Sequence, residues 1–296
     1  MKCRTIAVHL DAGERCAARV DVAARLAAAH GGHVVGIVAS GLADLVVGMN
    51  SNLPDDLECV VLTSAFLRER AQSVASDFER QMKRGAIGAA AVSHEVRVVE
   101  GEALEAVVLH GRCSDLVVVG QGEMGAGPGQ TACEFPQQVL LHAGPPVLIV
   151  PSAASAPGAY SAGAAGFAAP GACVLVAWKD TREAMRALRD AMPLLRRAGR
   201  VVLLEIVEPQ DRSAGSEASL KQVRAWLGRH GVEAEVRRES EVAGDVGEAL
   251  LWHAAAIEAD LLVMGGYGRS RLTEWLLGGA TRLLLERTTL PTLMSH

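Results

Sequence analysis

The chain has 296 residues, which is more than one compact core usually contains, so we expect two domains. Half of the residues are apolar but only 3% are aromatic, which predicts a core of Ala, Val and Leu between helices and buried parallel strands. A formal net charge of −5 gives no net attraction to a phosphate backbone, and no apolar run is long enough to cross a bilayer. These properties predict a cytoplasmic protein that binds neither nucleic acid nor membrane.

Short apolar runs bounded by turn residues alternate with longer segments of helical period, which is typical of repeated β-α-β units and predicts an α/β fold. The strands expected in the first half are residues 5–10, 34–39, 95–99, 116–120 and 147–150. Those expected in the second half are residues 173–178, 201–207, 234–238, 261–265 and 291–294. Helices are expected in the intervals of both halves.

The two halves follow one pattern. Residues 115–120 (DLVVVG) resemble residues 260–265 (DLLVMG) at an offset of 145 (260 − 115), and Pro146 and Pro291 are separated by the same offset. Chance rarely preserves such a spacing, so the chain is interpreted as a tandem repeat.

Residues 152–171, which lie between the halves, are almost entirely Ala, Gly, Ser and Pro and cannot bury a core. We therefore predict a first domain over residues 1–151, a flexible linker over 152–171 and a second domain over 172–296. A second irregular stretch, residues 40–62, is expected to be a surface insertion or a mobile flap.

One amphipathic helix is expected after the first strand of the second half. Met185, Leu188, Met192 and Leu195 recur at steps of three and four residues, which places an apolar stripe on one face. Thr181 precedes this segment as the expected N-cap. The helix is expected to cover the sheet rather than to carry chemistry.

The loop after the fourth strand of the second half is the best candidate ligand site, because ligands of open parallel sheets bind beyond the carboxyl ends of the strands. Its glycines are Gly265, Gly268, Gly278 and Gly279. Glycine lets the backbone approach a ligand closely, and the first N–H groups of the following helix attract anions. Arg269 and Thr281 add a positive charge and a hydroxyl donor. The pattern indicates a phosphate cradle, while tight turns alone are the alternative explanation of the glycines.

The first half provides an internal comparison for this loop. The residues 145 positions before Gly268, Gly278 and Gly279 are Glu123, Cys133 and Glu134. A carboxylate about 4 Å from a phosphate charge is repelled by about 4 kcal/mol at an effective dielectric constant of 20. Phosphate binding is therefore expected in the second domain only.

No catalytic or metal site is indicated by the sequence. The six cysteines show no C-x-x-C pair and no zinc spacing, and no Walker, nucleophile-elbow or Rossmann glycine motif is present. His9, His110, His142 and His253 are scattered and are interpreted as structural residues with satisfied ring nitrogens. The four tryptophans are expected to pack in the core or at a domain interface.

On these residues the chain resembles a tandem universal stress protein, and the resemblance covers nearly the whole sequence. ATP-binding members of that family carry Gly-x2-Gly-x9-Gly-(Ser/Thr), and Gly265, Gly268 and Gly278 match this frame, whereas Gly279 replaces the last hydroxyl residue. The resemblance implies five-stranded parallel sheets of order 3-2-1-4-5 with helices on both faces. Together with the residues of the loop and helix start considered above, the expected phosphate contacts are Gly265, Gly268, Arg269, Gly278, Gly279, Ala280 and Thr281.

The resemblance also implies where the adenosine part of a nucleotide would bind. The family uses an acidic residue after the first strand, and this position is Asp11 in the first half but Lys179 in the second. Asp180 is a candidate replacement for the acid, and Lys179 is a candidate phosphate ligand. Ile206 and Met264 would line the adenine, although strand packing explains both residues equally well.

We therefore expect a stress-response protein whose second domain binds ATP, with or without Mg²⁺, in a sensing role and with slow hydrolysis at most. Because fifth strands pair across dimers in the family, residues 147–150 and 292–294 are expected to pair within the chain as a pseudo-dimer, with a homodimer as the alternative. Lys179 and Gly279 depart from the binding pattern, so a scaffold that binds proteins instead of nucleotide is the competing hypothesis.

Overall fold

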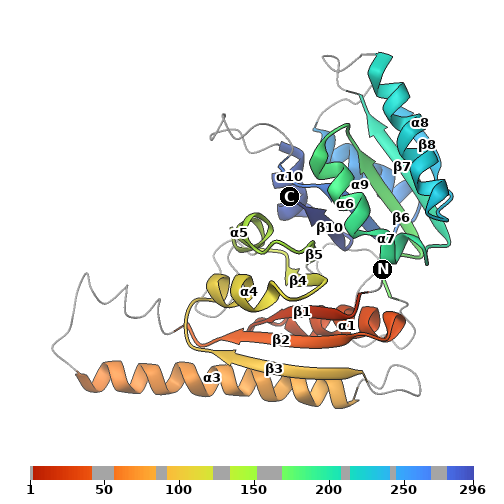
Figure 1. Ribbon diagram of the computed structural model, residues 1–296. Coiled ribbons are helices and arrows are strands. Elements are labelled where there is room, and N and C mark those ends of the chain that lie inside the picture. Colours follow the sequence, from red (N-terminus) through yellow and green to blue (C-terminus); the bar gives the residue numbers. More distant parts are fainter. Residues whose placement is uncertain are drawn as a thin grey trace. The chain divides into compact units, whose positions relative to one another are not determined.

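The computed structural model describes residues 3–41, 57–84, 92–122, 134–151, 169–207, 214–240, 245–267 and 279–296, except for the side chains of 57–62 and 214–216. The chain forms two compact units, Lys2–Pro145 and Pro146–His296, and both contain strands and helices (Figure 1). Most of the expected linker lies outside the described residues, so the predicted domain bounds of 1–151 and 172–296 stay a prediction.

The first unit is a parallel sheet flanked by two pairs of helices. The sheet has the order β3-β2-β1-β4 and consists of β1 (Thr5–Leu10), β2 (His33–Ala39), β3 (Ser93–Val99) and β4 (Leu116–Gly120). The helix pairs are α1 (Cys16–His30) with α3 (Leu57–Arg84), and α4 (Ala103–Gly111) with α5 (Phe135–His142). The connections to β2 and β3 each move to the next strand in one direction across the sheet, and the connection to β4 returns in the opposite direction. Because such connections are right-handed, the two helix pairs lie on opposite faces of the sheet.

The second unit repeats this sheet and adds one strand, in the order β5-β10-β9-β6-β7-β8. Its strands are β5 (Val147–Val150), β6 (Cys173–Trp178), β7 (Arg200–Ile206), β8 (Glu235–Glu239), β9 (Leu261–Gly265) and β10 (Thr292–Ser295). The five parallel strands of the second repeat have the expected 3-2-1-4-5 order. The added strand, β5, pairs antiparallel with β10, as expected for the last strands of the two repeats.

The helices of the second unit are α6 (Arg182–Asp190), α7 (Met192–Leu195), α8 (Ala214–Arg229), α9 (Val246–Ala256) and α10 (Gly279–Arg287). Thr181 is the N-cap of α6, as predicted, and its hydroxyl accepts a hydrogen bond from the Ala184 N–H at 3.2 Å. The prediction of one helix through Leu195 is wrong, because Pro193 cannot donate to a continuing helix and the chain starts a new turn there.

The predicted fold class of two repeated doubly wound α/β domains is confirmed. Strands β1, β4, β5, β6 and β9 have the predicted bounds, and the other strands differ by one or two residues. The core consists mainly of Val, Leu, Ile and Ala, as the low aromatic content predicted. The expectation of an irregular stretch over residues 40–62 is wrong at its end, since residues 57–62 are helical and residues 42–56 lie outside the described residues.

Equivalent aspartates hold the first strand of each repeat. The Asp115 carboxylate accepts hydrogen bonds from the backbone N–H groups of residues 4 and 5, at 2.7 and 3.0 Å. Asp260 accepts three such bonds from residues 171–173 at 2.9 to 3.1 Å. The repeated Asp-Leu sequence therefore has a structural role at the amino ends of the strands, opposite the expected ligand edge. In the described residues, no helix is long and apolar enough to cross a membrane.

Candidate functional site

Three strands of the second unit end side by side at the expected ligand edge. β7, β6 and β9 are neighbours in the sheet, and Ile206, Lys179 and Met264 lie at or next to their carboxyl ends. Lys179 and the following Asp180 are exposed, Ile206 is half-buried and Met264 is buried. The sheet thus brings together the residues expected to contact an adenosine, with both signs of charge on its rim.

The first turn of α10 lies at the end of the glycine-rich loop. Gly279 is exposed, Ala280 is half-buried, and Thr281 is buried on the helix face that also buries Leu284 and Leu285. The remaining expected phosphate contacts, which are Gly268, Arg269 and Gly278, lie outside the described residues.

A carboxylate approaches this first turn. Asp245 is the N-cap of α9, and its Oδ1 accepts a hydrogen bond from the Gly247 N–H at 2.6 Å. Its Oδ2 lies 2.9 Å from the position that a Cβ on Gly279 would take. A serine or threonine at 279 would require this oxygen, at the end of the Asp245 side chain, to shift. Asp245 also places negative charge where a phosphate is expected, and the two would repel each other.

Gly265 has a packing role of its own. A Cβ on Gly265 would lie 2.5 Å from the backbone nitrogen of Ala184 and 2.6 Å from the carbonyl carbon of Glu183. The end of β9 therefore touches the backbone of the first turn of α6, and only glycine permits that approach. The first glycine of the motif is explained by helix packing whether or not a ligand binds.

An ion pair with a buried glutamate near the same edge was not predicted from the sequence. Trp178, Glu205 and Arg238 are register neighbours on β6, β7 and β8. Glu205 is buried and pairs with Arg238 at 3.0 Å, and the Trp178 indole lies 3.3 Å from the Ser219 hydroxyl. The corresponding row in the first unit is Leu10, Val38 and Val98, which carries no charge.

The equivalent edge of the first unit is closed by a different ion pair. Arg19 and Asp11 lie 2.7 Å apart, with only 3% and 6% of their side chains exposed. Arg19 Nε also donates to the carbonyl of His9 at 3.2 Å, and a Cβ on Gly120 would clash with its guanidinium. Asp11, which occupies the position of the family's adenosine-binding acid in the first repeat, is thus already bound by a cation of its own chain.

His9 is buried beside this pair, with its ring centroid 4.5 Å from that of Phe135. Among the described residues its Nδ1 has no hydrogen-bond partner, so the expectation of a satisfied structural histidine is wrong at this atom. Burial, together with the charge of Arg19, lowers the pKa of His9 to about 3, which keeps the ring neutral. Among the described residues, no group of three or more His, Cys, Asp or Glu could hold a metal ion.

Residues 173–296 match the model of the universal stress protein family. The second repeat therefore belongs to the universal stress protein family. This match confirms the resemblance for the second repeat, and the solved structures below show the fold over the whole chain. Neither comparison tests the binding of ATP. No curated protein matches the chain.

Solved structures share the fold of the whole chain. A universal stress protein from Archaeoglobus fulgidus DSM 4304 is 17% identical, with a TM-score of 0.68 over 100% of this chain and 99% of its own. A functionally unknown protein from Pseudomonas aeruginosa PAO1 is 13% identical, with a TM-score of 0.60 over 99% of this chain and 92% of its own. At these identities the likeness establishes the fold alone. A universal stress protein solved in complex with cAMP is 23% identical, with a TM-score of 0.34 over 42% of this chain and 96% of its own.

The universal stress protein domain also holds a strained tyrosine that sequence analysis did not single out. Tyr267 follows Gly265 and Gly266 and has a positive φ of 55°, which is unusual for a residue with a side chain. Its hydroxyl is buried without a hydrogen-bond partner in the described part of the chain, and burial raises the pKa of Tyr267 far above the usual range. Its ring lies 6.1 Å from that of His296, whose Nδ1 is 3.2 Å from the Gly266 carbonyl. The loop thus begins in a backbone conformation that a residue pattern does not reveal.

Proposed function

We propose that the universal stress protein domain binds an adenine nucleotide such as ATP, and that the protein senses the nucleotide rather than turning it over rapidly. The observation that carries this proposal is the contrast between the two strand edges. Asp11 and Arg19 close the first edge, whereas the positions 168 residues later hold the exposed Lys179 and the small, buried Ala187. The second edge therefore presents a cation close to the strand ends.

Lys179 supports the binding of phosphate. A lysine about 4 Å from a phosphate charge gains about 4 kcal/mol at an effective dielectric constant of 20, and solvent screening reduces this gain for an exposed side chain. The N–H groups at the start of α10 add attraction for an anion. Asp245 acts against it, and Mg²⁺ bound to the phosphates would offset that repulsion because carboxylate oxygens are suitable ligands for this ion.

Isothermal titration of the full chain with Mg-ATP tests the proposal. We expect one site per chain, and we expect the dissociation constant for Mg-ATP to be at least tenfold higher in Lys179→Glu than in the wild type. Lys221→Glu is the matched control, since Lys221 is an exposed lysine of the same domain that pairs with Glu217 on α8. No heat of binding, together with no nucleotide released from denatured purified protein, would refute the proposal.

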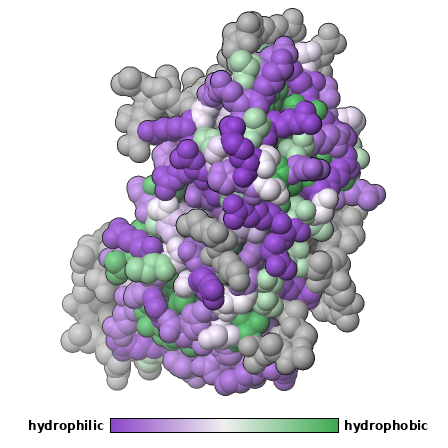
Figure 2. All heavy atoms as spheres, turned by 45° about the vertical axis from the view of Figure 1, so that its right-hand side comes forward, coloured by the Kyte–Doolittle hydropathy of each residue, from purple (hydrophilic) through white to green (hydrophobic). Residues whose placement is uncertain are grey.

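A protein-binding scaffold is the second candidate, and two exposed side chains favour it. Trp252 on α9 is 67% exposed, which excludes the core as its location, while the expected packing at a domain interface stays a prediction. Leu109, its counterpart on α4 at an offset of 143 (252 − 109), is 55% exposed. The face in Figure 2 is largely hydrophilic with scattered hydrophobic side chains. The scaffold would be favoured by a partner protein that binds equally well with and without ATP and whose affinity is lowered by Trp252→Ala and by Leu109→Ala.

A further inference from the structure

Two helices of the second unit begin side by side at the expected ligand edge. α9 follows β8 and α10 follows β9, so both helices start where parallel strands of one sheet end. A Cβ on Gly247, in the first turn of α9, would lie 3.2 Å from the Cα of Ala280 and 3.0 Å from the Leu283 side chain. The first turns of the two helices are therefore in close contact, and the positive ends of both helix dipoles lie near the same place.

The Asp245 carboxylate is held between two glycines of these first turns. Its Oδ1 accepts the hydrogen bond from the Gly247 N–H at 2.6 Å and lies 3.0 Å from the position of a Cβ on Gly247. Its Oδ2 lies 2.9 Å from the position of a Cβ on Gly279. Both oxygens thus lie against backbone that has no side chain, and the cap of α9 keeps a negative charge beside the start of α10.

Asp245 carries a negative charge that no cation of the described residues offsets. Within that part of the chain it caps α9, and no ion pair includes it. The next carboxylate on the helix, that of Glu248, is exposed and lies 3.6 Å from the Arg287 guanidinium. Asp245 is therefore the carboxylate of this helix start that is available to a cation brought by a ligand.

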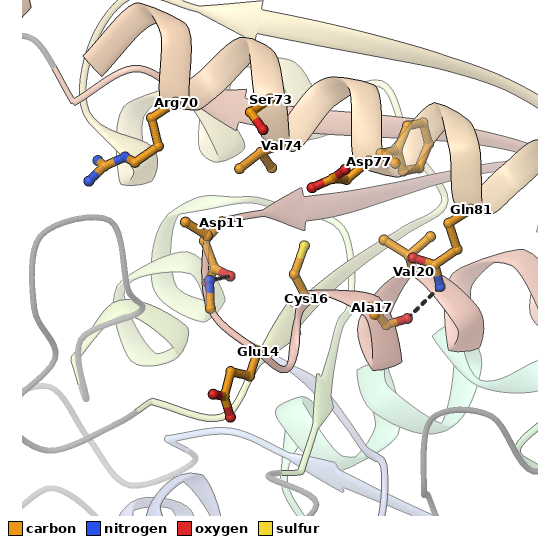
Figure 3. A pocket seen from close by; sticks show the side chains of 13 residues that line it. Asp11, Glu14, Cys16, Ala17, Val20, Arg70, Ser73, Val74, Asp77 and Gln81 are labelled. Carbon is orange, nitrogen blue, oxygen red and sulfur yellow. Dashed lines mark hydrogen bonds between the residues drawn. The ribbon is translucent and has the colours of Figure 1, made fainter. Parts of the chain in front are cut away.

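The ligand edge of the first unit shows a different charge balance. A cavity of about 270 Å³ lies there between the loop after β1, the start of α1 and one side of α3 (Figure 3). Its lining includes three carboxylates, which belong to Asp11, Glu14 and Asp77. Arg19 pairs with Asp11 at 2.7 Å. Asp77 pairs with Arg80, and Arg70 lines the cavity as well. Because arginines offset these carboxylates, this edge has no excess of charge that would select a ligand.

We propose that Asp245 makes the nucleotide site of the second unit select a nucleotide complexed with Mg²⁺ over the same nucleotide as a free anion. This inference rests on the nucleotide binding proposed above. A free polyphosphate beside α10 would place its charge close to the Asp245 carboxylate, and the two would repel each other. Mg²⁺ on the phosphates removes this repulsion, because this ion is usually held by one or two carboxylates together with substrate phosphates.

The described residues fit a metal ion that arrives with the nucleotide rather than one that the protein holds alone. They contain no group of three or more His, Cys, Asp or Glu that could bind a metal ion. Asp245 supplies a single carboxylate, and the phosphates would have to supply further oxygen ligands. Asp245 therefore acts on the choice between two forms of one nucleotide.

The variant Asp245→Asn tests this inference, because asparagine caps a helix as well as aspartate does but carries no charge. Isothermal titration of the full chain measures the dissociation constants of Mg-ATP in excess MgCl₂ and of free ATP in EDTA. In the wild type we expect free ATP to bind at least about tenfold more weakly than Mg-ATP. In Asp245→Asn we expect the ratio of the two dissociation constants to fall at least about fivefold, because free ATP binds more tightly while the affinity for Mg-ATP changes little.

Glu248→Gln is the matched control, since it removes the same charge from the same helix at an exposed position that is paired with Arg287. Its ratio should stay within about twofold of the wild type, because exposed ion pairs are individually weak. The inference is overturned, with the nucleotide proposal intact, if the wild type binds both forms equally or if Asp245→Asn lowers the ratio no more than Glu248→Gln does. A ratio that falls only because Mg-ATP binds less tightly overturns it as well. If the wild type binds neither form of ATP, both proposals are refuted.

Discussion

The replacement Arg19→Ala tests the closed edge of the first unit most directly. Arg19 and Asp11 are both more than nine-tenths buried and lie 2.7 Å apart, so removal of the arginine leaves a buried carboxylate without its cation. Breaking such a pair costs about 3–5 kcal/mol. The hydrogen bond from Arg19 to the His9 carbonyl is lost as well, and this loss is included in the same free-energy cost. We therefore expect the free energy of unfolding of the first unit to fall by about 3–5 kcal/mol at pH 7.

The two units can be followed separately because all four tryptophans lie after residue 172. In urea denaturation of Arg19→Ala, the circular dichroism transition of the first unit should move to a lower urea concentration. The tryptophan fluorescence transition, which reports on the second unit, should keep its midpoint. Arg25→Ala is the control, because its pair with Asp21 is partly exposed and is expected to contribute only about 0.3–0.5 kcal/mol. The double variant Asp11→Asn/Arg19→Met should recover much of the loss, since it leaves no unpaired charge. A loss below about 1 kcal/mol in Arg19→Ala would show that the pair does not close this edge.

Three further predictions follow from single contacts. Asp260→Ala removes the acceptor of three backbone N–H groups and should destabilise the second unit by about 1–3 kcal/mol in the tryptophan fluorescence transition, and an unchanged midpoint would contradict the anchoring role. Gly265→Ala forces a Cβ against the α6 backbone and should lower the free energy of unfolding of the second unit, measured in the same fluorescence transition, by at least about 2 kcal/mol. If this glycine served only a ligand, the stability of the unliganded protein would be unchanged. The folded-state pKa of His9, near 3, lies below its ordinary 6.5, so the unfolded chain takes up the extra proton and the stability of the first unit should fall as the pH drops from about 6.5 toward 3. His9→Gln should show a smaller loss between pH 7 and pH 4.5 in circular dichroism, and an equal loss would show that other groups cause it.

Much of the fold could be predicted because its signals are local. Runs such as residues 116–120 and 261–265 are apolar throughout and bounded by turn residues, and both form buried strands with the predicted bounds. The break between α6 and α7 was missed because the apolar spacing continues through Met192, while Pro193 acts on the backbone rather than on that spacing.

The candidate site was predictable only in part. The repeat located Lys179, Ile206 and Met264 at neighbouring strand ends, since strand order and parallel direction follow from the family pattern. It gave no sign that Arg19 reaches Asp11 or that Gly265 touches α6, because these contacts depend on how closely each helix approaches the sheet. A residue pattern contains no information about that distance.

The amino-acid sequence by itself determined the duplication, the positions of the strands and the glycine frame, since composition, periodicity and spacing are all properties of a linear chain. Tertiary structure alone decided which charges are neutralised. Asp11 is paired with a buried arginine, and Asp245 lies against the first turn of α10. The physical reason is that the strength of a charge interaction depends on separation and burial in three dimensions, and both are set only when helices and strands pack.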